Sequence, residues 1–110
     1  MPFDESLAAR TREVLARKER IQEKKMFGGI GFLLNGNLLV AVRKDSLLVR
    51  LGPEQGEEAL AEPHATEFQI KGRGTMKGWL VVSQERVEDD KRLKEWIQRA
   101  IRFVDTLPSK

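Results

Sequence analysis

The sequence predicts a two-layer α+β domain with a mainly antiparallel five-stranded sheet and helices on one face. Apolar residues recur at helical spacing near both ends of the chain. Between these segments, short apolar runs alternate with glycine, proline and asparagine, as in strands joined by turns. We therefore expect the order helix, three strands, short helix, two strands, helix, in a single domain over residues 1–110.

Composition is that of an ordinary globular domain, with 40% hydrophobic and 34% charged residues. No apolar run approaches the roughly 20 residues that a bilayer requires, and the first ten residues do not resemble a secretory signal. We therefore expect a cytoplasmic protein that does not contact a membrane. The absence of cysteine excludes disulfides and thiolate metal sites. The net charge of +3 permits contact with polyanions without requiring it.

The N-terminal segment predicts a helix from Asp4 to about Lys18. Leu7, Val14 and Leu15 share one face of such a helix, because they are separated by seven and eight residues. Asp4 is suited to the N-cap, where a side-chain oxygen accepts a hydrogen bond from the first turn. Basic residues close the last turn, where the helix dipole favours positive charge.

A three-stranded meander is expected next, with strands at 21–34, 38–43 and 46–51. Asn35 and Gly36 join the first two strands, because a type I′ turn needs positive φ at both central positions. The second strand is apolar on consecutive residues, which predicts a central position with both faces covered. Glycines inside the first strand indicate a bulge or a close approach of another backbone: Gly28, Gly29 and Gly31.

A short helix and a fourth strand are expected after the meander. Pro53 cannot continue a strand ladder but suits the first position of a helix, so the prediction is a helix over 53–61. Phe68 and Ile70 alternate with polar residues, which is the period of a strand with one solvated face.

The last part of the chain predicts a fifth strand at 79–82, from its aromatic and β-branched residues, and a C-terminal helix. Asp89 or Asp90 caps this helix, which runs to about Leu107. One stripe of the helix is apolar and is expected to face the core: Leu93, Trp96, Ile97, Ala100, Ile101 and Val104.

Catalytic and metal-binding motifs are not indicated. The glycines at 28–31 lack the spacing and the Gly-Lys-Ser/Thr of a phosphate-binding loop. His64 is the only histidine, so it has no second imidazole for a transition-metal site. No serine lies in a Gly-x-Ser-x-Gly elbow. We therefore expect neither a cofactor nor enzymatic activity, and Glu57-Glu58 and Asp89-Asp90 are interpreted as acids at helix beginnings.

Two basic sets with aromatic neighbours leave weak nucleic-acid binding open as an alternative. Acidic residues interrupt the first set, which favours a solvated helix face with intrahelical ion pairs. The possible contacts are Arg10, Arg17, Arg20, Lys24 and Lys25 in the first set and Lys71, Arg73 and Lys77 in the second.

Three segments together resemble the N-terminal domain of the TfoX competence-regulator family: Lys25–Phe32 (KMFGGIGF), Met76–Trp79 (MKGW) and Leu93-x-x-Trp96-x-x-x-Ala100. The resemblance implies an α+β fold with an antiparallel sheet, and it implies no catalytic residue and no cofactor. Longer family members regulate DNA-uptake competence genes and carry a second, helical domain, for which this chain has no room, so we expect a stand-alone domain. The motif residues are Met26, Phe27, Gly28, Gly29, Gly31, Met76, Gly78, Trp79 and Trp96.

The leading interpretation is a non-enzymatic regulatory or protein-interaction module. The strands hold more apolar residues than two helices can cover, so the second sheet face is expected to meet a partner. A second copy in a two-fold homodimer is the simplest partner, with Val81 or Val82 facing outward. An unidentified protein, a nucleic acid and, third, the substrate of a small enzyme are the other possibilities.

Overall fold

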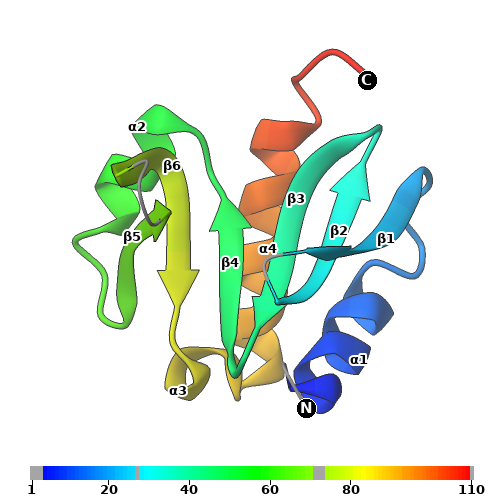
Figure 1. Ribbon diagram of the computed structural model, residues 1–110, viewed down its shortest axis with the longest axis horizontal. Coiled ribbons are helices and arrows are strands. Elements are labelled where there is room, and N and C mark those ends of the chain that lie inside the picture. Colours follow the sequence, from blue (N-terminus) through cyan, green and yellow to red (C-terminus); the bar gives the residue numbers. More distant parts are fainter. Residues whose placement is uncertain (1–3, 27, 71–73, 110) are drawn as a thin grey trace.

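The computed structural model describes residues 4–26, 28–70 and 74–109, which form one open antiparallel sheet with helices against it (Figure 1). The helices are α1 (Glu5–Val14), α2 (Pro53–Ala59), α3 (Gln84–Val87) and α4 (Asp90–Val104). The strands are β1 (Ile21–Met26), β2 (Gly29–Leu34), β3 (Asn37–Arg43), β4 (Ser46–Arg50), β5 (Ala65–Ile70) and β6 (Gly74–Val82). Their order across the sheet is β1-β2-β3-β4-β6-β5. The α+β class is confirmed, with six strands among these residues instead of five.

The predicted first strand at 21–34 is a hairpin of two strands. β1 and β2 pair antiparallel from Ile21 opposite Leu34 to Met26 opposite Gly29. Gly28 lies at the reversal with φ 74°, a left-handed conformation that glycine adopts without a steric penalty. Gly28, which was interpreted as part of a strand bulge, therefore belongs to the turn between β1 and β2. Phe27 lies outside the described residues.

Gly29 lacks a side chain for a different reason, which is space. A Cβ built on Gly29 would overlap the backbone carbonyl oxygen of Val42 on β3. At Gly31 a Cβ would lie 2.6 Å from the sulfur of Met26, whose side chain covers that position. The glycines thus allow three strands to lie close together at this corner of the sheet.

Local chemistry accounts for the turns and helix ends. Asn35 and Gly36 have φ values of 54° and 83°, positive at both positions as a type I′ turn requires. The carboxylate of Asp4 accepts a hydrogen bond of 3.1 Å from the N–H of Leu7 at the start of α1. Asp89 caps α4 in the same way, through a 2.9 Å bond from the N–H two residues on. Both predicted caps are confirmed.

All four helices contribute to one core on a single face of the sheet, and Figure 1 shows α4 passing behind β3 and β4. The buried stripe of α4 comprises Leu93, Trp96, Ile97, Ala100 and Val104. The strands supply Phe32, Val40, Val42, Leu47, Val49, Leu80 and Val82 to the same core. β3 is interior in the sheet and its residues 39–42 are fully buried, which confirms its predicted central position. No helix among the described residues has both the length and the apolar character needed to span a bilayer.

α2 rests directly on the backbone of β6 at a contact between glycines. A Cβ on Gly56 of α2 would lie 2.8 Å from the Cα of Gly78, and a Cβ on Gly78 would lie 2.7 Å from the carbonyl carbon of Gly52. Gly78 has φ 85°, and its carbonyl oxygen accepts hydrogen bonds from the N–H groups of Leu51 and Gly52. β6 therefore bends here, and it begins at Gly74, earlier than the predicted start of the fifth strand at residue 79.

The two adjacent glycines predict substitutions of unequal cost. Gly29→Ala should lower the free energy of unfolding by about 1–3 kcal/mol, because the new methyl group meets backbone that cannot rotate away. Gly28→Ala should cost about 1 kcal/mol, since open space surrounds it and only the left-handed φ is unfavourable.

Urea denaturation of both variants measures this difference. Gly28→Asn is a matched control that should be better tolerated than Gly28→Ala, because asparagine adopts positive φ more readily. An unchanged urea midpoint for Gly29→Ala would contradict the close approach of β2 and β3 at this position.

Candidate interaction surface on the open sheet face

The face of the sheet away from the helices is called here the open face, and its residues alternate with those of the main core. Strand register assigns them, because directly paired residues of antiparallel strands share a side. The open face comprises Gln22, Lys24 and Met26 of β1, Gly29, Gly31 and Leu33 of β2, Leu38, Ala41 and Arg43 of β3, Ser46, Leu48 and Arg50 of β4, Thr66 and Phe68 of β5, and Trp79 and Val81 of β6.

The centre of the open face is a small apolar cluster covered by the chain itself. Ala41, Leu48 and Phe68 are buried together, with Leu48 fully buried and Phe68 only 3% exposed. Trp79 and Val81 pack against them and remain half-buried. Apolar residues therefore occupy both sheet faces, as expected, but only the rim of this second cluster reaches solvent.

The strand register distinguishes the two outward-facing candidates on β6. Val81 pairs with Leu48 and belongs to the open face, where it is half-buried. Val82 pairs with Leu47 and is fully buried in the main core. A charge at Val81 therefore probes the surface, whereas a charge at Val82 would disrupt the core.

Two arginines lie over aromatic rings of the open face. The guanidinium carbon of Arg43 is 5.1 Å from the ring centroid of Phe68. That of Arg50 is 4.9 Å from the Trp79 ring and 5.7 Å from the ring of Phe103 on α4. At these distances the ring quadrupole attracts the cation. Partial burial lowers the pKa of Arg50, because the charged form has lost part of its hydration.

No sequence motif marks these arginines. Ser46, Leu48 and Arg50 alternate with the main-core residues Leu47 and Val49 along β4, so a period of two was the available signal for Arg50. Which aromatic ring each arginine meets depends on β5 and β6, and that pairing is not local in sequence.

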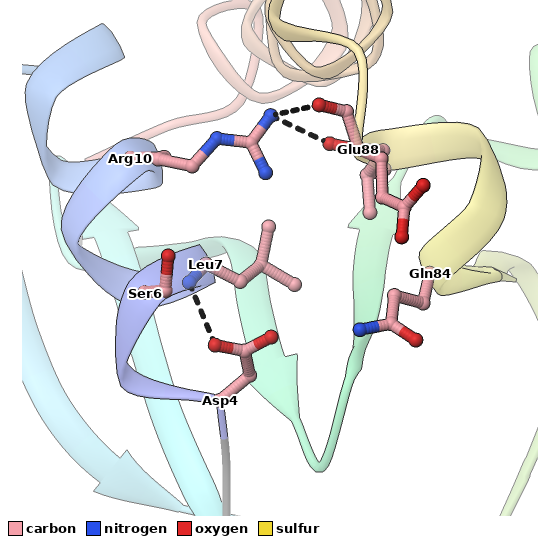
Figure 2. A pocket seen from close by; sticks show the side chains of 7 residues that line it. Asp4, Ser6, Leu7, Arg10, Gln84 and Glu88 are labelled. Atoms are coloured by element: carbon pink, nitrogen blue, oxygen red, sulfur yellow. Dashed lines mark hydrogen bonds between the residues drawn. The ribbon is translucent and has the colours of Figure 1, made fainter.

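Arg10, a possible nucleic-acid contact, instead joins α1 to the segment between α3 and α4. Its Nε donates to the carboxylate of Asp90 at 2.8 Å. One terminal nitrogen donates to the carbonyl oxygens of Val87 and Glu88, at 2.7 and 2.9 Å, as Figure 2 shows. Arg10 thus connects helices rather than presenting its donors to solvent.

Beside Arg10 lies a hollow of about 170 Å³ between α1 and α3 (Figure 2). Its polar groups already have partners inside the molecule, since Asp4 caps α1 and Arg10 donates a hydrogen bond to the carbonyl oxygen of Val87 on α3. The hollow is therefore a joint between helices. Its lining is Asp4, Ser6, Leu7, Arg10, Gln84, Val87 and Glu88.

Two further cations of the N-terminal segment, Arg12 and Lys18, form ion pairs between elements instead of the intrahelical pairs expected. Arg12 binds the carboxylate of Glu23 on β1 through two hydrogen bonds of 2.9 and 2.7 Å. This bond raises the pKa of Arg12 and lowers that of Glu23. Lys18 lies 3.6 Å from the carboxylate of Asp105.

The remaining predicted nucleic-acid contacts divide into two groups. Those of the first set that make no ion pair with the described residues are exposed: Arg17, Arg20, Lys24 and Lys25. Lys71 and Arg73 lie outside the described residues, and so does the side chain of Lys77. The described residues therefore place only the first basic set.

The residues of the three recognised motifs lie in three separate places. Met26, Gly28, Gly29 and Gly31 shape the β1–β2 hairpin, whereas Gly78 and Trp79 form the bend of β6 and the rim of the open face. Trp96 lies in the main core, 3% exposed, under the guanidinium of Arg99. The side chain of Met76, like Phe27, lies outside the described residues.

Comparison with protein families yields one finding. The model of the TfoX N-terminal domain matches residues 13–104 of the 110-residue chain. This range includes β1 through β6 and ends with the last residue of α4. No curated protein matches the chain.

The ion pair between Arg12 and Glu23 predicts a small, pH-dependent contribution to stability. Glu23→Gln should reduce the free energy of unfolding at pH 7 by less than about 1 kcal/mol, because both groups are near the surface. The folded state lowers the Glu23 pKa, so the contribution is complete above the ordinary value of 4.5 and disappears as pH falls through the folded value.

Denaturation curves at pH 7 and at pH 3 measure the effect. Glu13→Gln is the control, because Glu13 lies beside Arg12 on α1 and makes no ion pair with the described residues. A deficit of Glu23→Gln that stayed constant between the two pH values would contradict an electrostatic origin.

Proposed function

The chain belongs to the TfoX N-terminal domain family, and from this membership we propose a non-enzymatic regulatory module that binds another protein through its open face. Family membership supports a regulatory or interaction role. The observation that carries the proposal is the half-buried pair Trp79 and Val81, which lies beside a buried apolar cluster on the side of the sheet away from the helices.

The composition of this surface is that of an interface centre. Tryptophan and arginine are the residues most enriched among those that contribute most to protein association. Trp79 and Arg50 are paired across β6 and β4, with half-buried Val81 on the same side. Regular strands hold all three in place, so little ordering is required when a partner binds.

The described hollows support the binding of a small substrate less well than the open face supports the binding of a protein. Ligand pockets are lined mainly by apolar and aromatic walls. A hollow of about 510 Å³ among the described residues has a different lining, mostly of polar and charged side chains: Arg17, Lys18, Glu19, Arg20, Leu34, Asn35 and Asp105. Its lining supports a binding module more than a small-substrate site.

A homodimer through the open face stays a prediction, and two features of the structure bear on it. The expected exposed apolar patch is smaller, because Leu48 and Phe68 are covered within one chain. A two-fold interface through this face would also carry the same two arginines on both of its sides. Sedimentation equilibrium at micromolar concentration decides, because twice the 12.6 kDa chain mass would assign the face to a second copy.

Weak nucleic-acid binding is a second candidate, supported by the exposed cations Arg17, Arg20, Lys24 and Lys25. Single-strand binders also stack bases on aromatic rings. Here Phe68 is buried and Arg50 lies over Trp79, so the open face offers no uncovered ring among the described residues. The charge alone supports this candidate, and it predicts retention on a polyanion column that falls steeply with salt.

A photocrosslinking amino acid at Thr66 tests the proposal, since Thr66 is exposed on the open face beside Val81. In lysate of the source cell, this variant should yield a crosslinked protein of discrete mass. The control is the same amino acid at Gln98, which is exposed on α4 in the opposite layer.

Val81→Glu added to the Thr66 variant should abolish the product, because it places a charge in the half-buried rim without entering the core. Its thermal midpoint should remain close to that of the parent. Equal products from Thr66 and Gln98, or no product from either, would contradict binding through the open face.

A further inference from the structure

We propose that the partner presents a carboxylate-bearing acidic segment to the open face, with Arg50 as the residue that receives it. This inference rests on the proposed function and names the chemistry of its partner. It follows from the surroundings of Arg50, from a second arginine of the same chain and from the charges of the open face.

Arg50 is a half-buried cation whose contacts are aromatic. Its guanidinium carbon is 4.9 Å from the centroid of the Trp79 ring and 5.7 Å from that of the Phe103 ring on α4. It forms no ion pair with the described residues. A guanidinium carries five N–H donors, and ring contacts use none of them in a conventional hydrogen bond. The group is therefore oriented by the rings and partly dehydrated, while no hydrogen bond joins its donors to the residues that the structure describes.

The same chain shows the complete arrangement at Arg99. Its guanidinium lies 4.4 Å from the ring centroid of Trp96 and also binds the carboxylate of Glu62 at 2.9 Å. Arg50 and Trp79 reproduce the arginine and the tryptophan without the carboxylate. Partly buried cations are usually paired, because burial without a counter-charge is unfavourable. The comparison identifies a carboxylate as the missing group.

The charges of the open face determine where that carboxylate must come from. Among the described side chains, the charged residues on this side are the cations Lys24, Arg43 and Arg50, and no acidic residue of the described strands shares it. Glu23 pairs with the core residue Phe32, and Glu67 lies opposite the core residue Leu80. A second copy would bring the same cations, so charge complementarity selects a different and acidic protein.

Apolar neighbours favour a protein segment over a nucleic acid. Half-buried Val81 and Leu38 lie on the same face as Arg50 and offer contacts to apolar side chains between acidic residues. Phosphates would satisfy the guanidinium equally well, but the bases would need open rings on which to stack.

Fluorescence anisotropy with a labelled synthetic peptide of alternating Glu and Leu tests the inference on the whole chain. The wild type should bind this peptide, and Arg50→Gln should weaken binding about tenfold or more, as for loss of a charge-assisted hydrogen bond. Arg50→Lys, which keeps the charge but not the planar fork, should bind with intermediate strength. Arg102 is exposed on α4, so Arg102→Gln is the matched control and should bind as the wild type does.

Two further probes separate the alternatives. A Gln and Leu peptide that binds wild type and Arg50→Gln equally well would overturn the acidic chemistry. An oligothymidylate that binds through Arg50 more tightly than the acidic peptide would replace the inference with a nucleic-acid site. Failure of the wild type to bind the acidic peptide would also overturn it.

The result is independent of the crosslinking test of the proposed function. A product at Thr66 without binding of the acidic peptide would retain the protein-binding face and reject the acidic partner. Thermal melts of each variant confirm that lost binding is not lost folding, and Arg50→Met keeps the apolar stem if Arg50→Gln unfolds.

Discussion

The contact between the backbones of α2 and β6 is the constraint on which the rest of the open face depends. Gly78 meets Gly56 and Gly52 at distances that leave no room for a side chain, and its carbonyl oxygen holds the end of β4 through two hydrogen bonds. The bend of β6 that follows from its left-handed φ directly precedes Trp79. Glycine backbone at this one contact therefore determines where half-buried Trp79 meets Arg50 on β4.

Local signals in the sequence were sufficient for the parts of the fold that local chemistry determines. Asp4 and Asp89 are helix caps, Asn35-Gly36 is a hairpin turn, and the apolar stripe of α4 is buried, because each depends on neighbours within a few residues. The hairpin at Gly28 was missed because a glycine in a bulge and a glycine in a turn look alike without the pairing partner. The four-residue α3 has too few residues for a periodic pattern.

The site was less accessible to sequence reasoning than the fold. The motif residue Trp79 was recognised, but its role at the rim of the open face depends on β4, β5 and β6 meeting in one sheet. The covering of Leu48 by Phe68 is equally nonlocal, because these residues lie on strands that do not pair with each other. An apolar count along the chain therefore overestimated the surface left for a partner.

The charged edge of the sheet has a consequence for the behaviour of the molecule in concentrated solution. β1 leaves one row of backbone donors and acceptors without a neighbouring strand, which in many proteins invites fibril growth. Here residues 22–25 are exposed, with Glu23 held by Arg12 and two lysines beside it. Charged side chains, lysine above all, disfavour the pairing of such an edge with another strand. The β1 edge is thus protected against cross-β polymerisation, and recognition is left to the surface of the sheet.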